Sequence, residues 1–261
     1  MRQVDERRDD WNAHWSDYDR SASENHAITY RHRIIRRLIA ASGMSSMQIL
    51  DIGSGQGDLL ARAAVWFPGS QLVGLEVSEV GVGLARKRVP SAQIFCCSLF
   101  DPPEALAAYL AWATHAACSE VLEHLDDPVA FLRQTKKYLA DGATLIVTVP
   151  GGKMSAFDRH IGHRRHFTRQ DIRVVLKQAG FQVERVYLAG FPFFNLYRLV
   201  VIARGEKLVD DVKAGHRGWS KILAHAAMHV FNLLFRLNAI EVPPVFRLPE
   251  GAVHATRFSL C

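Results

Sequence analysis

Six short apolar segments lie between residues 47 and 190, and each is followed by a glycine turn or by a segment with helix signals. Strands that alternate with helices form a parallel sheet with helices on both faces, so each strand is buried on two sides and is apolar throughout. The alternation therefore predicts an α/β fold. The six segments are 47–52, 71–78, 92–100, 113–120, 143–150 and 181–190.

The segments between the predicted strands contain clear helix boundaries. Asp127 and Pro128 mark a helix start, because aspartate caps a helix and proline fits its first turn. Thr168 and Gly180 are the expected cap and end of a later helix. Residues 30–42, before the first strand, have isoleucine and leucine at helical spacing with arginines between them, which predicts an amphipathic helix.

Composition narrows the class of protein. The chain is 49% hydrophobic and 22% charged, as expected for a globular protein with a sizeable core. The net charge of +6 would suit an anionic partner, but acidic and basic residues are mixed along the chain. Nucleic acid is therefore not the favoured partner.

Cysteines and apolar runs bear on the location of the protein. The four cysteines have no zinc-binding spacing, and the adjacent Cys96 and Cys97 would point to opposite faces of a strand, so reduced thiols are expected. Residues 1–11 are charged and lack the apolar core of a secretory signal. No run of eighteen apolar residues predicts a membrane span. These features predict a cytoplasmic protein.

The first predicted strand ends in a glycine turn. Gly53, Gly55 and Gly57 have the spacing G-x-G-x-G, which lets the backbone turn tightly and approach a ligand. The turn lacks the last glycine of the dinucleotide-binding fingerprint. The second strand ends in Glu76, where a carboxylate can accept both hydroxyls of a ribose. The two strand ends together predict a nucleoside-containing ligand.

Taken together, these segments resemble class I S-adenosylmethionine-dependent methyltransferases. The resemblance covers residues 48–190 and includes ILDIGSGQGDLL, LVGLEVSE, SEVLEHLDDPVAFLRQTKKYLADGATLIVTVP and a closing GF-x-V-x-x-V segment, in the order and spacing of that family. It implies a Rossmann-like sheet of seven strands, mostly parallel with an antiparallel last strand, to which VHATRFSLC corresponds. It also implies S-adenosylmethionine as the methyl donor.

The resemblance further implies which residues hold the donor. The three glycines would wrap its methionine and ribose portions, and Glu76 would hold the ribose hydroxyls. Many members have an acidic residue after the third strand to bind adenine, whereas this chain has Ser98 there. The expected donor site comprises Asp51, Gly53, Ser54, Gly55, Gly57, Glu76, Val77, Ser98, Leu99 and Glu120.

Glu120, Glu123 and His124 follow the fourth predicted strand. Their spacing of three and four residues would put them on one face of a single helical turn. Two carboxylates and an imidazole so close together need a cation, water or protonation to compensate them. A second group lies after the fifth strand, where its loop can fold over the same pocket: Asp158, His160, His163 and His166.

The first group resembles the E-x-x-E-H set with which ubiquinone-biosynthesis O-methyltransferases and small-RNA terminal 2′-O-methyltransferases hold a divalent ion. The RNA enzymes add a later histidine, which His163 matches by its distance from the Phe-Thr-Arg sequence at 167–169. Mixed oxygen and nitrogen ligands would suit Mg²⁺ or Mn²⁺. The ligands implied are Glu120, Glu123, His124 and His163.

A site without metal is the favoured interpretation. EVLEH also occurs in methyltransferases with no known metal, where its glutamates serve the helix start and loop. His163 or His166 would then remove the acceptor's proton, with Glu123 and His124 shaping the pocket.

We expect a single domain over 1–261. Residues 1–47, with the aromatic Trp11, Trp15 and Tyr18, would form a helical lid over the donor. Residues 48–190 and 254–261 would form the donor-binding core, and 191–253 a helical insertion that caps it.

The hydrophobic character of the insertion bears on the acceptor. A long RNA needs a wide basic channel, so an apolar cap favours a small aromatic or lipophilic acceptor, methylated at oxygen. The same insertion could form a dimer interface or contact a membrane surface. Four alternatives stay open: transfer to nitrogen or carbon, an RNA 2′-O-methyltransferase, a dinucleotide-binding oxidoreductase, and a non-catalytic donor-binding protein.

Overall fold

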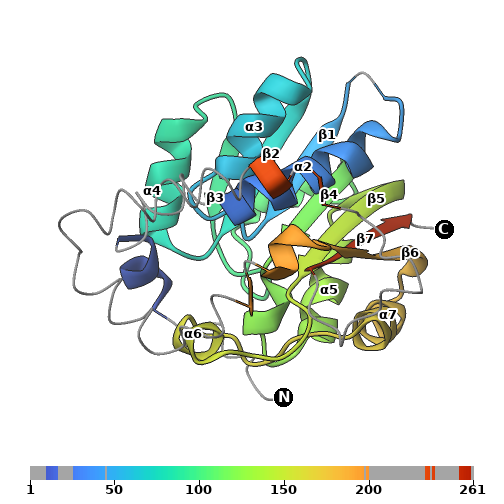
Figure 1. Ribbon diagram of the computed structural model, residues 1–261. Coiled ribbons are helices and arrows are strands. Elements are labelled where there is room, and N and C mark those ends of the chain that lie inside the picture. Colours follow the sequence, from blue (N-terminus) through green and yellow to red (C-terminus); the bar gives the residue numbers. More distant parts are fainter. Residues whose placement is uncertain are drawn as a thin grey trace.

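The computed structural model describes residues 10–16, 26–44, 46–196, 198–199, 233–235, 237–238 and 253–259. Tyr18 and most of the predicted insertion lie outside these residues. Figure 1 shows a central sheet between two layers of helices. The strands are β1 (Gln48–Ile52), β2 (Gln71–Glu76), β3 (Gln93–Cys96), β4 (Ala113–Ser119), β5 (Leu139–Val149), β6 (Gln182–Ala189) and β7 (Val253–Ser259).

The helices lie on both faces of the sheet, which confirms the predicted α/β class. In Figure 1, α2, α3 and α4 cover one face, and α5 and α7 cover the other. A short helix at 11–16 precedes them. The remaining bounds are α2 (His26–Ala40), α3 (Asp58–Trp66), α4 (Glu79–Arg88), α5 (Pro128–Lys136), α6 (Ala156–His160), α7 (Arg169–Gln178) and the 3₁₀ turns η2 (Glu104–Tyr109) and η3 (Leu122–His124).

The strand order is β3-β2-β1-β4-β5-β7-β6. Strands β1 to β5 pair in parallel, whereas β7 pairs antiparallel with both β5 and β6. The chain order reverses between β1, which pairs with β2 on one side, and β4 on the other. Ligands bind in such sheets at the carboxyl ends of the strands beside this switch point.

Strands β1 to β6 contribute to two apolar cores. Leu50 and Ile52 of β1 pack with Phe131 of α5 in one core, whereas Ile49 packs with Ile34 of α2 in the other. Alternate residues of a strand face opposite layers, so burial on both faces requires a continuous apolar run. This burial explains why the strand segments are apolar throughout.

The start of β5 and the state of the cysteines can be compared with the predictions from the sequence. Strand β5 begins at Leu139, four residues before the predicted start, because Leu139 pairs with Ala113 ahead of a register shift. The described cysteines Cys96, Cys97 and Cys118 are all free thiols, as predicted. Within the described residues, no helix is long and apolar enough to span a membrane.

A capping box begins α7. The Thr168 hydroxyl accepts from the backbone N–H of Asp171 (3.1 Å), and the Asp171 carboxylate accepts from the N–H of Thr168 (2.9 Å). We expect Thr168→Ala to lower the free energy of unfolding by ~1 kcal/mol. Urea denaturation measures this loss, and Thr168→Ser, which keeps the hydroxyl, is the control. Equal destabilisation by serine and alanine would contradict a role for the cap.

Candidate functional site

A cavity of about 110 Å³ lies at the carboxyl ends of β1, β2 and β4, beside the switch point. Five of the residues expected at a donor site line it: Gly53, Glu76, Val77, Leu99 and Glu120. The other five do not appear in its lining: Asp51, Ser54, Gly55, Gly57 and Ser98. The cavity is smaller than the ~300 Å³ at which small-molecule sites begin.

The glycine turn is tied to β2. The N–H groups of Gly53 and Ser54 both donate to the carbonyl of Leu75 at 2.9 Å. Gly53, Gly55 and Gly57 have φ of 73°, 52° and 80°, where a side chain is strained. A Cβ on Gly53 would lie 2.5 Å from a methyl group of Val121. The turn therefore needs glycine both for its backbone and for close packing.

Glu76 stabilises the same turn through hydrogen bonds to its carboxylate. Its carboxylate accepts from the N–H of Gly55 (2.7 Å), Ser78 (2.9 Å) and Val77 (3.0 Å). Burial raises the pKa of Glu76, and these N–H groups oppose the rise. The carboxylate is therefore fixed in orientation while it lines the cavity.

Asp51 lies beneath the turn and is 3% exposed. Burial, with Glu76 and Asp58 nearby, raises its pKa to about 7. Its position at the end of β1 suits a residue that supports the turn from inside the protein.

The helix at 11–16 contributes to the wall of the cavity. Trp11 and Trp15 both line it, and Trp15 lies against the glycine turn, 2.5 Å from where a Cβ on Gly55 would be. Asn12 anchors this helix, because its side-chain oxygen accepts from the Ser78 hydroxyl at 2.7 Å. Since Ser78 is the N-cap of α4, the helix at 11–16 is attached to the same strand end as Glu76.

The end of β3 contributes apolar walls. Cys97 and Leu99 line the cavity together with Phe131 of α5. The Ser98 hydroxyl instead accepts from the N–H of Phe100 (3.1 Å) and stabilises its own turn. Sequence reasoning missed Cys97 and Phe131, although the position of Cys97 directly after β3 could have indicated it.

The single helical turn expected for Glu120, Glu123 and His124 is wrong. Glu120 precedes the 3₁₀ turn η3 and has φ of 56°, which is rare for a residue with a side chain. Glu120 therefore does not share the η3 turn with Glu123 and His124. Its carboxylate accepts from Thr148 (3.3 Å) and lies 3.5 Å from a guanidinium nitrogen of Arg31.

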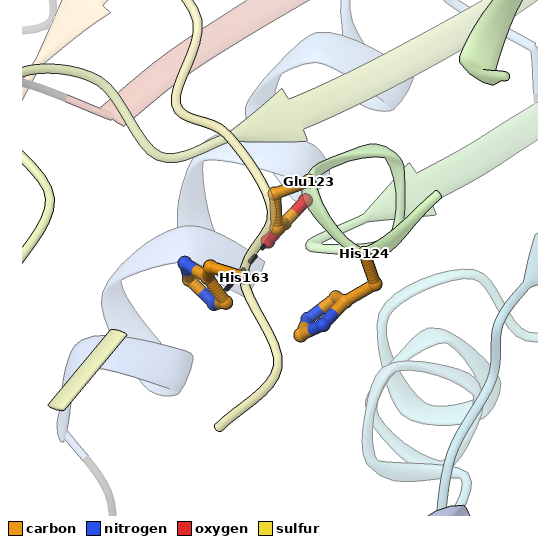
Figure 2. Close-up of side chains that lie close together, drawn as sticks. All are labelled: Glu123, His124 and His163. Atoms are coloured by element: carbon orange, nitrogen blue, oxygen red, sulfur yellow. Dashed lines mark ion pairs between the residues drawn. The ribbon is translucent and has the colours of Figure 1, made fainter. Parts of the chain in front are cut away.

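Glu123, His124 and His163 converge instead. Figure 2 shows the three side chains pointing toward one another from the turn after β4 and the loop after α6. Glu123 has no exposed surface, and within the described residues neither of its carboxylate oxygens has a hydrogen-bond partner. Its Oε1 lies 4.0 Å from Nε2 of His163, and the rings of His124 and His163 are 4.7 Å apart.

Two backbone contacts bring the histidine loop to this place. The N–H of Arg164 donates to the carbonyl of Glu123 (2.8 Å), and the N–H of Phe167 donates to that of Pro150 (3.0 Å). Phe167 itself is buried in the core. The loop is thus fixed at the residue that follows His163 and at the residue that follows His166. His160, in contrast, is exposed on α6.

Burial controls the charge of this cluster. It raises the pKa of Glu123 well above the ordinary 4.5, and Glu120 adds to the rise. It lowers the pKa of His124 to about 4, and, with His124 beside it, lowers that of His163 to about 3. The histidines are therefore neutral near pH 7, with lone pairs available for a cation or a proton. Ligand atoms of Glu123, His124 and His163 all lie within 4.8 Å of one another.

The chain belongs to the methyltransferase-domain family, whose model matches residues 25–186. A trans-aconitate 2-methyltransferase from Acidovorax sp. (strain JS42) is 27% identical over 134 residues, which are 51% of this chain and 50% of that protein. The chain spans about half the length of the curated relatives that it matches.

Solved structures share the fold. Phosphoethanolamine N-methyltransferase 2 from Haemonchus contortus, in complex with S-adenosyl-L-methionine, has a TM-score of 0.56 at 17% identity, covering 87% of this chain and 52% of that one. The (4+2)-cyclase SpnF has a TM-score of 0.58 at 16% identity, covering 88% and 81%. Since a cyclase shares the fold, the activity has to be argued from the site.

Proposed function

We propose that this protein transfers a methyl group from S-adenosylmethionine to a small acceptor, most readily at oxygen. The observation that supports this best is the Glu76 carboxylate, which lines the cavity while it is bound to the N–H of Gly55. A ribose needs a carboxylate at the end of β2, and the donor's methionine portion needs a close backbone such as the glycine turn. The apolar Leu99 and Phe131 fit the faces of an adenine.

The chain's own residues have few chemical tasks in this reaction. S-adenosylmethionine supplies an already activated methyl group. The protein has to position an acceptor in line with it and exclude water. The helix at 11–16 is a suitable lid, because Trp11 and Trp15 line the cavity. Residues 191–253 are proposed as the cap over the acceptor.

An oxygen acceptor also has to lose a proton. Glu123, His124 and His163 meet beside the cavity, and His124 lines it. A buried carboxylate with no hydrogen-bond partner is costly unless something positive lies against it. These three side chains fit Mg²⁺ or Mn²⁺, which would lower the pKa of an acceptor hydroxyl. Glu120, proposed as a fourth ligand, would first have to leave Arg31.

Without a cation, the same cluster would work through a proton. Glu123 would then be protonated, and His163 would accept the proton of the acceptor. Burial keeps the His163 ring neutral with a lone pair, but it lowers the pKa to about 3, so His163 is a weak base in this arrangement. The proposed oxygen specificity depends on one of these two arrangements.

The acceptor atom can be tested with the full chain, methyl-labelled S-adenosylmethionine and three probes, each with and without Mn²⁺. We expect transfer to the hydroxyl of a dihydroxybenzoate. Imidazole tests nitrogen, and trans-aconitate, the substrate class named for a relative, tests a carboxylate. Transfer to imidazole alone would contradict oxygen specificity. If only trans-aconitate is labelled, the proposed aromatic acceptor is wrong and the acceptor is a carboxylic acid.

A further inference from the structure

We propose that His166 is a positioning residue that fixes the tautomer of His163, so that a lone pair on Nε2 of His163 faces Glu123. The inference deepens the proposed function, and its catalytic consequence rests on that function. It separates two histidines that the sequence offers as equivalent bases. His163 would exchange the proton or hold the cation, and His166 would act only through it.

The first step is the protonation of His166. Its Nδ1 lies 3.0 Å from the carbonyl oxygen of Gly152, which can only accept a hydrogen bond. Nδ1 therefore bears the proton. The Arg198 guanidinium is farther from this nitrogen, at 3.4 Å, and its shorter contact is to Asp158 at 3.1 Å. The carbonyl contact thus decides the tautomer.

The second step is that His166 has a lone pair on Nε2. The ring carries a single proton, because a second one would place a positive charge beside the Arg198 guanidinium, which lies 3.4 Å from Nδ1. Asp158, 3.7 Å from Nε2, would favour a charged ring. However, its Oδ2 already accepts from the N–H (2.7 Å) and hydroxyl (2.9 Å) of Ser155 and from Arg198. With its charge compensated in this way, Asp158 needs no proton on His166.

The lone pair on Nε2 of His166 determines which nitrogen of His163 bears the proton. Its Nδ1 lies 3.1 Å from Nε2 of His166. Since Nε2 of His166 can only accept, Nδ1 of His163 has to donate, and Nε2 of His163 is left with a lone pair. That nitrogen lies 4.0 Å from Oε1 of Glu123. Two acceptors that face each other at this distance define a place for one proton or one cation.

Such an outer hydrogen bond is how proteins commonly orient a histidine that binds a metal or a proton. Loss of the partner in comparable sites costs ~10–100-fold in metal affinity or activity. We therefore expect His166→Phe to weaken Mn²⁺ binding about 10–100-fold while the affinity for S-adenosylhomocysteine stays unchanged. His166 does not line the donor cavity, which is why the two affinities separate.

The test is nitrogen NMR of the histidine rings in the full chain, free of metal. The signals of His163 are identified by their loss in His163→Gln. In the wild type, we expect a proton on Nδ1 and none on Nε2. His166→Phe should abolish this preference, whereas His166→Gln should restore it, because the amide oxygen can accept from Nδ1. His160→Gln, on the exposed part of α6, is the control that should change nothing.

Two results would overturn the inference: a proton on Nε2 of His163 in the wild type, or an unchanged tautomer in His166→Phe. If His166→Phe does not fold, the inference is tested by the tautomer of His163 in the wild type and in His166→Gln. Calorimetry with S-adenosylhomocysteine is run on the same samples. Failure of that binding would count against the proposed function, whereas the tautomer would still test the role of His166.

Discussion

Replacing Gly55 by alanine is expected to weaken binding of S-adenosylhomocysteine on the order of 100-fold, or ~2.7 kcal/mol of binding free energy. Gly55 has φ of 52°, a conformation strained for alanine. A Cβ there would lie 2.5 Å from a ring carbon of Trp15. Either the indole or the turn has to move, and movement of the turn breaks the bond between the Gly55 N–H and Glu76. Isothermal titration calorimetry measures the affinity.

Gly69→Ala is the matched control. Gly69 also has a left-handed backbone, with φ of 85°, but a Cβ there would meet nothing within 4 Å. The strained backbone should lower the folding stability of both variants by ~1 kcal/mol. Only Gly55→Ala should lose donor affinity. Similar affinities in the two variants would contradict the placement of the donor against the glycine turn.

Replacing Glu123 by glutamine is expected to reduce turnover by about 100-fold or more, the usual contribution of a group that manages the acceptor's proton. Mn²⁺ binding, measured by electron paramagnetic resonance, should be lost as well. Donor affinity should stay the same, because Glu123 does not line the cavity. Within the described residues the buried Glu123 carboxyl has no hydrogen-bond partner to lose, so glutamine should not lower the thermal midpoint.

This combination separates a functional role from a structural one. Glu104→Gln, on the exposed η2 turn, is the control and should leave turnover, metal binding and stability unchanged. Lost turnover together with a lower thermal midpoint would indicate that Glu123 serves only packing. If Glu123→Gln keeps its turnover and the wild type binds no Mn²⁺, Glu123 would have no catalytic role. Both the metal-bound cluster and the protonated cluster would then be contradicted.

The fold was predictable because local sequence specifies it. Continuous apolar runs such as 47–52 require burial on both faces, and capping residues such as Thr168 fix where helices begin. The glycine turn and Glu76 were predictable for a related reason. Parallel strands bring their carboxyl ends together, so two strand-end motifs have to meet at the switch point.

The parts that sequence could not give depend on contacts between distant segments. The place of Trp15 over Gly55 follows from the anchoring of Asn12 on Ser78, which no local pattern reports. Glu120 lies outside the η3 turn, against Arg31, and has a positive φ that residue type does not predict.

Calorimetric titration of the full chain with S-adenosylhomocysteine, with NADH in parallel, decides between a methyl-donor site and a dinucleotide site. We expect one saturable site for S-adenosylhomocysteine and none for NADH. Glu76→Ala should weaken the site by about 10–100-fold, as expected for a lost hydrogen bond to a charged group. Binding of NADH without S-adenosylhomocysteine, or full affinity in Glu76→Ala, would contradict a methyl-donor site at the glycine turn and Glu76.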